Sequence, residues 1–127
     1  MTFHHAPYTV LARNERNWYI LQLGDGRIQL DFGPFAVAFG CKAFQVLHSL
    51  VEAALEGPTV AGCIAHAGVE RSIWFDPQRG TLLLAFDGMV LRFLSHELLA
   101  FTCLCRAAAT KLGTGPLPPP SSAGSLN

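Results

Sequence analysis

Four cysteines are the residues best suited to metal or redox chemistry, and their spacing supports neither. They are Cys41, Cys63, Cys103 and Cys105, and none of them forms the closely spaced Cys or His pairs of a zinc site. Cys103 and Cys105 lie two residues apart in a segment with helical periodicity, so their side chains point to different sides. Free cysteine is commonly buried. We therefore expect structural thiols, no metal site and no cofactor.

The histidines, carboxylates and serines form no catalytic pattern. Asp31 and Asp87 flank expected turns, where aspartate stabilises the backbone, and nothing in the sequence brings them into one cleft for acid–base catalysis. Ser95 lacks the G-x-S-x-G motif of a nucleophilic serine. The histidines share no spacing with an acid or a cysteine; they are His4, His5, His48, His66 and His96. We predict that the protein is not an enzyme and has no catalytic residues.

Large aromatic side chains could instead bind a partner. Trp18, Tyr19, Trp74 and Phe75 lie in corresponding segments of the two halves of the chain, and exposed aromatic rings anchor proteins or stack on nucleic-acid bases. Alternate residues of a strand face opposite sides, so part of this cluster belongs to the core. Counting alternate residues along both strands, with Tyr19 taken as equivalent to Ile73, assigns the side chains to two opposite faces. One face carries Tyr19, Leu21, Ile73 and Phe75, and the other carries Trp18, Ile20, Ser72 and Trp74.

The elements that position these residues are set by an internal duplication. Gly26–Leu55 matches Gly80–Ala109 without a gap, at an offset of 54 residues. In each copy two apolar strand patterns are followed by a segment with apolar residues at helical spacing. The identical pairs are Gly26/Gly80, Leu30/Leu84, Phe32/Phe86, Phe39/Phe93, Leu50/Leu104, Ala53/Ala107 and Ala54/Ala108.

Each copy begins with a predicted β-hairpin. Asp87-Gly88 favours a two-residue type I′ turn, and Gly33-Pro34 takes the same place in the first copy. A further strand precedes each hairpin, at residues 17–23 and 71–75, and weaker patterns at residues 8–12 and 63–66 could add a fourth. The turns put one phenylalanine set on the face that the helices cover: Phe32, Phe39, Phe86 and Phe93.

The predicted fold class is α+β, an internally duplicated β(3–4)α unit with an antiparallel sheet backed by two helices. The helices are expected near residues 42–55 and at Ser95–Leu112, with Ser95 as N-cap. A single curved sheet and a pseudo-twofold axis would make residues 1–112 one domain, with repeats at about 8–56 and 62–112. One domain also suits a chain of 127 residues.

The composition does not favour a strongly charged partner. Nine basic residues balance nine acidic ones, so nothing steers the chain toward phosphate or an anionic membrane. The start lacks the pattern of a signal peptide, and no apolar run approaches the ~20 residues that span a bilayer. We expect no membrane span and a cytoplasmic location.

Residues 113–127 have the composition of an extended tail rich in Pro, Gly and Ser. A polyproline-like path would suit its prolines, which are Pro116, Pro118, Pro119 and Pro120. We predict that this segment runs along a partner protein.

The second face of the hairpins differs between the copies. In the first copy this face carries Arg27, Gln29 and Asp31, which suit water. In the second it carries Thr81, Leu83 and Ala85, joined by Val90 across the turn, and such an apolar patch is typical of an interface. The predicted partner-binding residues are Trp18, Trp74, Leu83, Ala85, Val90, Pro116, Pro118, Pro119 and Pro120. Coverage of the patch by the same chain remains an alternative.

Two resemblances follow from these patterns. A strand ending in Phe32-Gly33, with Phe39 and Phe44 beyond it and Arg71-Ser72-Ile73 before the second hairpin, resembles small bacterial proteins of unknown function over about residues 10–110, and implies no activity. The duplicated, strand-rich unit ending in a helix is similar to PUR-repeat and Whirly-type single-strand nucleic-acid binders. Those families use a basic, aromatic sheet, and this chain lacks the basic excess.

The sequence therefore favours a non-catalytic protein–protein interaction module, a small accessory subunit of a larger bacterial assembly in a homo- or hetero-oligomer. The alternative is a single-stranded nucleic-acid-binding protein of PUR/Whirly-like topology, with nucleic acid the less expected partner. A small-molecule pocket between the halves is a third interpretation.

Overall fold

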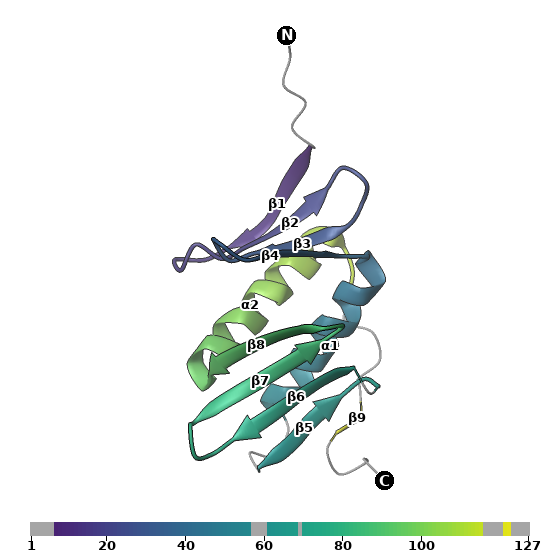
Figure 1. The fold of residues 1–127 in the computed structure, drawn as a ribbon. Coiled ribbons are helices and arrows are strands. Elements are labelled where there is room, and N and C mark those ends of the chain that lie inside the picture. The colour runs from purple at the N-terminus through teal and green to yellow at the C-terminus, as the bar shows by residue number, and fades with distance from the viewer. Residues whose placement is uncertain (1–6, 57–60, 69, 116–120, 123–127) are drawn as a thin grey trace. The chain divides into compact units, whose positions relative to one another are not determined.

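The computed structural model describes residues 7–56, 61–68, 70–115 and 121–122 (Figure 1). The chain divides into two compact units. The first comprises Met1–Gln45 and Leu104–Gly115, and the second comprises Val46–Cys103 and Pro116–Asn127. Each unit contains one antiparallel sheet.

The first unit contains a four-stranded meander in the order β1-β2-β3-β4 (Figure 1). Its strands are β1 (Tyr8–Arg13), β2 (Tyr19–Leu23), β3 (Ile28–Asp31) and β4 (Ala36–Phe39). Helix α1 (Cys41–Glu56) begins in this unit and continues in the second. The C-terminal half of α2 (Ser95–Leu112) also belongs to the first unit.

The second unit repeats the meander and adds a short strand at one edge, in the order β8-β7-β6-β5-β9. Two residues of the C-terminal tail pair with Ala65 and His66 of β5. The strands are β5 (Gly62–His66), β6 (Arg71–Asp76), β7 (Thr81–Phe86), β8 (Met89–Leu94) and β9 (Ser121–Ser122).

The α+β class and the repeated unit are confirmed, with four strands before each helix. The expectation of a single curved sheet is wrong, because among the described residues no strand of the first meander pairs with one of the second. The first sheet ends with β4, and α1 begins two residues after that strand, at Cys41. Each meander is therefore a sheet of its own.

Both hairpins form at the predicted turns. Asp87 and Gly88 have φ of 51° and 87°, the two positive values that a type I′ turn requires. Gly33 has φ of 90° and Pro34 is held near −65° by its ring, a combination that fits a type II′ turn. Counting outward from each turn gives the observed cross-strand pairs, with Leu84 opposite Leu91 and Ile28 opposite Phe39.

A bulge at the same place in both units supports the duplication. The pairing of β1 with β2 shifts between Val10 and Ala12, and the pairing of β5 with β6 shifts between Cys63 and Ala65. The skipped residues, Leu11 and Ile64, are 5% and 2% exposed. In each unit an extra apolar residue is thus turned into the core at the first strand.

Aromatic and aliphatic side chains fill the core of each unit. Phe39, Phe86 and Phe93 are buried as predicted, and the Phe93 ring stacks on that of Phe101 in α2, with centroids 5.4 Å apart. Phe32 is an exception: its backbone N–H donates to the Phe35 carbonyl across the turn, but its side chain is only half-buried.

The start of α2 is stabilised by an acidic residue one turn in. The Glu97 carboxylate accepts a hydrogen bond of 2.7 Å from the Leu94 backbone N–H. Leu94 therefore takes the N-cap position, and Ser95, expected there, is the first helical residue. The anionic side chain also lies where the helix dipole favours it.

Candidate interaction surface

The second sheet has one face on which most side chains lie outside the buried core. Strand register identifies its members. Leu83 lies opposite Trp74 on β6 and opposite Arg92 on β8, and Ala85 lies between Ser72 and Val90. Directly opposed residues of antiparallel strands share a face. We call this set, together with Leu94 opposite Thr81, the outer face of the second sheet.

Large apolar side chains on this outer face reach the surface. Val90 is 60% exposed, Trp74 47% and Leu94 43%, and Leu83 and Ala85 are half-buried between them. Isolated exposed apolar residues are ordinary. Here they occupy three adjacent strands in register, which makes a contiguous patch of the kind that marks an interface.

The Trp74 indole is held in place from below. Its Nε1–H donates a hydrogen bond of 2.8 Å to the Ser72 hydroxyl, and Ser72 is only 7% exposed. The only polar atom of the ring is therefore already satisfied, so a partner can cover the ring without stripping water from an unpaired donor. A fixed ring also loses less rotamer freedom when it is buried.

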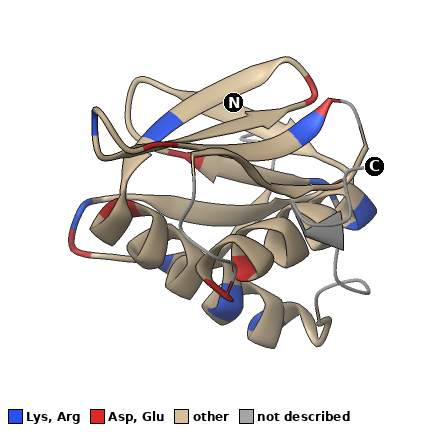
Figure 2. Cartoon of the chain, turned by 90° about the horizontal axis from the view of Figure 1, so that it is seen from below, with Lys and Arg blue, Asp and Glu red and all other residues tan. Residues whose placement is uncertain are grey.

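Charge on the outer face is sparse and of both signs. Arg92 lies on β8 and Asp76 on β6, paired with Leu83 and Thr81 of the central strand. Blue and red positions are interspersed in Figure 2, and neither colour covers a whole element. Burial raises the pKa of the Cys63 thiol, which lies opposite Trp74. A thiol that stays protonated behaves as a small apolar group.

The remaining predicted site residues lie elsewhere. Trp18 belongs to the first unit and precedes β2; its ring lies 4.9 Å from that of Phe32, and the Arg16 guanidinium lies 5.4 Å from the ring centroid. The predicted tail positions fall outside the described residues; they are Pro116, Pro118, Pro119 and Pro120.

The strand faces assigned to the aromatic cluster are wrong in one respect. Tyr19 lies opposite Asp31 and Ser72 lies opposite Ala85, so Tyr19 corresponds to Ser72 and not to Ile73. The connection to the third strand is one residue longer in the second unit, and a shift of one residue reverses the face. Leu94 was also missed as a surface residue, because β8 extends one residue beyond Phe93.

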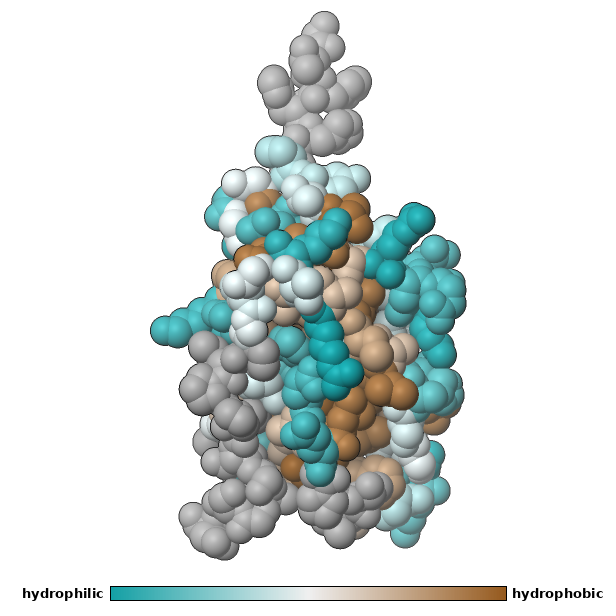
Figure 3. Space-filling model, turned by 180° about the vertical axis from the view of Figure 1, so that it is seen from behind, coloured by the Kyte–Doolittle hydropathy of each residue, from teal (hydrophilic) through white to brown (hydrophobic). Residues whose placement is uncertain are grey.

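Other parts of the surface also show apolar atoms. Brown regions appear among the teal ones in Figure 3, and on α2 Leu99 is 49% exposed while its neighbour one turn on, Cys103, is also exposed. This helical row contains only one large side chain. The outer face of the second sheet is therefore the stronger candidate for an interface.

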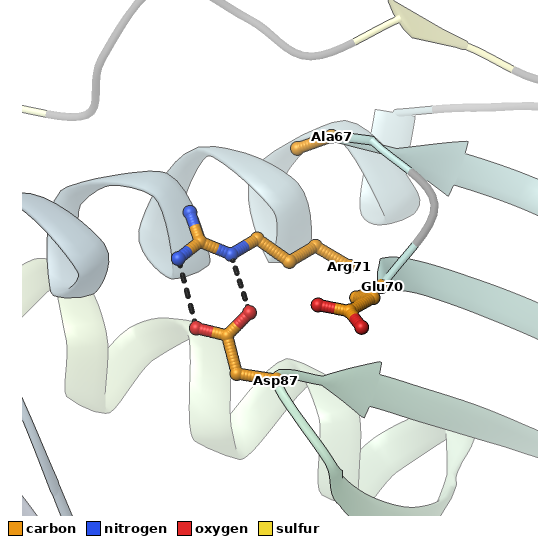
Figure 4. A pocket seen from close by; sticks show the side chains of 4 residues that line it. All are labelled: Ala67, Glu70, Arg71 and Asp87. Carbon is orange, nitrogen blue, oxygen red and sulfur yellow. Dashed lines mark hydrogen bonds and ion pairs between the residues drawn. The ribbon is translucent and has the colours of Figure 1, made fainter.

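A polar hollow of about 470 Å³ lies beside the second hairpin. Figure 4 shows Arg71 and Asp87 turned toward each other across it, with Glu70 and Ala67 at its margin. Arg71 donates two hydrogen bonds of 2.8 Å to the Asp87 carboxylate, and its guanidinium lies 4.7 Å from the Phe86 ring centroid. This bidentate pair fastens β6 to the hairpin turn, which is a structural role.

The hydrogen bonds between Arg71 and Asp87 lower the pKa of Asp87 and raise the pKa of Arg71. The pair therefore stabilises the fold fully above pH 4, and this contribution is lost as the pH falls through the lowered pKa of Asp87. Solvent reaches both side chains, which are 29% and 38% exposed, so the contribution is at most about 1 kcal/mol.

We expect Asp87→Asn to lower the free energy of unfolding by up to about 1 kcal/mol at pH 7 and by much less near pH 2. Asparagine tolerates the positive φ of this position, so the turn itself should survive. Urea unfolding at the two pH values measures the effect. An equal loss at both would mean that the ion pair contributes nothing.

No three side chains of His, Cys, Asp or Glu within the described residues could hold a metal ion together. Neither helix has the combination of length and apolar character needed to cross a bilayer. Comparison of the chain with known protein families, with curated proteins and with solved structures gave no match.

Proposed function

We propose that this protein is a non-catalytic interaction module, a small accessory subunit of a larger bacterial assembly, and that it binds other subunits through the outer face of the second sheet. The observation that carries the proposal is the exposure of Trp74 on β6 and of Val90 and Leu94 on β8, on either side of the half-buried Leu83 and Ala85 of β7. Interfaces are built around such aromatic and aliphatic anchors.

The occupant we propose is a second copy of the chain. A twofold interface places the same patch on both partners, so the patch must be complementary to itself. The outer face has Arg92 on one side of the central strand and Asp76 on the other. A twofold axis along β7 would bring each β8 over the partner's β6, which keeps the Arg92 side chains of the two copies apart. The formal net charge of zero adds no repulsion between copies.

Single-stranded nucleic acid is the alternative occupant. The observation in its favour is the exposed Trp74 ring on an antiparallel sheet, with Arg92 two strands away. Base stacking on such a ring is sequence-tolerant. Against it, Arg92 is the only basic residue among those named for the outer face, and phosphate contacts supply most of the affinity in non-specific binding.

Sedimentation velocity over a range of concentrations separates the two functions. We expect a reversible dimer whose dissociation constant changes little between low and high salt, because apolar burial dominates it. A labelled oligothymidylate added to the same samples should bind weakly or not at all. A monomer at all concentrations that binds the oligonucleotide with a steep salt dependence would replace the proposal by its alternative.

Finer features of the architecture belong to the same proposal. We propose that residues 1–112 act as one domain in which two helices back the sheets about a pseudo-twofold axis. The sharing of α1 and α2 between the compact units supports this. We also propose that the protein works in the cytoplasm and that its proline-rich segment contacts a partner. An experimental structure with the helices away from both sheets would contradict the architecture.

A further inference from the structure

The outer face of the first sheet contains a hollow of about 280 Å³. Tyr8 and Val10 of β1, Tyr19 and Leu21 of β2, and Asp31 of β3 line it. Strand register explains the grouping, since Val10 lies opposite Leu21 and Tyr19 lies opposite Asp31. All of these residues belong to the first unit, so the hollow is formed within one sheet.

The two tyrosine rings are not packed on each other. Within the described part of the chain, no ring contact joins Tyr8 or Tyr19 to another aromatic side chain. Tyr8 is 59% exposed and Val10 38%. Within the described residues no other aromatic ring therefore covers the two tyrosines, of which Tyr19 is half-buried, and Leu21 between them is only 8% exposed.

The Asp31 carboxylate is positioned at one end of the hollow. One of its oxygens accepts a hydrogen bond of 3.1 Å from the Gly33 backbone N–H in the hairpin turn. That bond fixes the carboxylate and leaves its other oxygen for a ligand, because the described residues offer it no further hydrogen bond or ion pair. Among the described residues that line the hollow, Asp31 alone carries a formal charge at neutral pH.

We propose that this hollow binds an organic cation, an ammonium or methylated ammonium group held by the two tyrosine rings and the Asp31 carboxylate. Cations are attracted to the faces of aromatic rings, and more strongly where water is partly excluded. A negative charge within the lining opposes a phosphate or a carboxylate ligand. The cation could belong to a free small molecule or to a methylated lysine of a peptide, and the chemistry of recognition is the same.

The second unit supports this assignment by contrast. At the positions that correspond to Val10, Tyr19 and Asp31, its outer face carries Cys63, Ser72 and Ala85. The duplicated units have thus diverged on the same face, one toward an apolar patch and the other toward aromatic rings with a carboxylate. The proposal does not depend on association of the chain through the second sheet.

Arg13 is the nearest basic residue that the strand register identifies. It lies opposite Tyr19 on the same face, is exposed, and is not part of the lining. Its charge should weaken the binding of a cation through solvent, over about a Debye length. Arg13→Gln is therefore expected to tighten binding slightly, which is the opposite of the effect of the lining variants.

Titration of the full chain with choline, followed by NMR chemical shifts, tests the site. We expect saturable shifts around β1–β3, and a neutral isostere, 3,3-dimethylbutan-1-ol, should bind at least about tenfold more weakly. Asp31→Asn, which can still accept the Gly33 hydrogen bond, and Tyr8→Leu, at an exposed position, should each weaken choline binding by about 3- to 30-fold. Glu15→Gln, which removes an exposed carboxylate of the first unit outside the lining, is the matched control and should change nothing.

A trimethyl-lysine peptide and its unmodified form distinguish the two sources. Tighter binding of the trimethylated peptide than of choline would assign the site to a protein partner, and the reverse would assign it to a free metabolite; either result supports the cation site. Equal binding of choline and its neutral isostere, an unchanged affinity in Asp31→Asn, or no shifts at millimolar choline would overturn it. None of these outcomes bears on dimer formation, so the two proposals fail separately.

Discussion

Phe86→Ala is expected to lower the free energy of unfolding by about 3–5 kcal/mol, a large part of the stability of a domain of this size. The Phe86 side chain is fully buried, and its ring lies under the Arg71 guanidinium. Truncation therefore leaves a cavity and removes the surface on which Arg71 rests while it binds Asp87. Urea unfolding followed by circular dichroism measures the loss.

Two further variants make this result specific. Phe86→Leu keeps most of the volume and should cost less than the alanine variant. Leu99→Ala removes a side chain that is 49% exposed on α2 and should change stability by no more than about 0.5 kcal/mol. If Phe86→Ala unfolded at the same urea concentration as the wild type, Phe86 would not face the core and the strand register would be wrong.

Leu83→Lys combined with Val90→Glu is expected to abolish association without unfolding the protein. Neither side chain belongs to the buried core, so the fold should persist. In an interface, the two new charges would be stripped of water with no partner opposite each, which costs several kcal/mol. Sedimentation velocity should show a monomer at concentrations where the wild type is a dimer.

A control variant with the same two added charges at other positions shows whether loss of the dimer depends on where the charges are placed. Gln78→Glu combined with Leu99→Lys adds one negative and one positive charge at exposed positions outside the outer face, and should leave the dimer intact. Val90→Glu alone changes a position that is 60% exposed, so it tests the interface even if Leu83→Lys unfolds the protein. Unfolding of the double variant by circular dichroism, together with an unaffected dimer in Val90→Glu, would show that the patch is internal.

Local signals in the sequence predict the hairpins and helices well. A type I′ turn needs only Asp87 and Gly88, and each pair in the following ladder is set by counting outward from it. The same is true of α2, which begins and ends at the predicted residues. The α+β class and the repeated unit follow from these elements without knowledge of any distant contact.

Features that depend on pairing between distant segments could not be predicted. The bulges that turn Leu11 and Ile64 into the core carry no sequence signal of their own. One extra residue between Ile73 and Leu84, compared with Ile20 and Leu30, reversed the expected faces of the second strands. The separation into two sheets likewise depends on which strand edges meet.

The candidate surface was predictable only where its residues are set by a local signal. Leu83, Ala85 and Val90 follow from alternation around a single turn, and the structure places them on one face with Trp74. The position of Leu94 on this face could not be predicted, because it depends on where β8 ends. The hollow with Tyr8, Tyr19 and Asp31 needed the pairing of three strands, and the sequence suggested only that Asp31 serves a turn.

The most direct test of the proposed interface is the accessibility of Trp74 as the protein associates. In a Trp18→Phe background Trp74 is the only tryptophan, so acrylamide quenching of its fluorescence reports on that ring alone. We predict efficient quenching in dilute monomer, because the side chain is 47% exposed, and a clear fall in the quenching constant over the concentrations at which sedimentation shows a dimer forming. A dimer that forms while the quenching constant stays the same would contradict the account, because the outer face of the second sheet would then lie outside the interface.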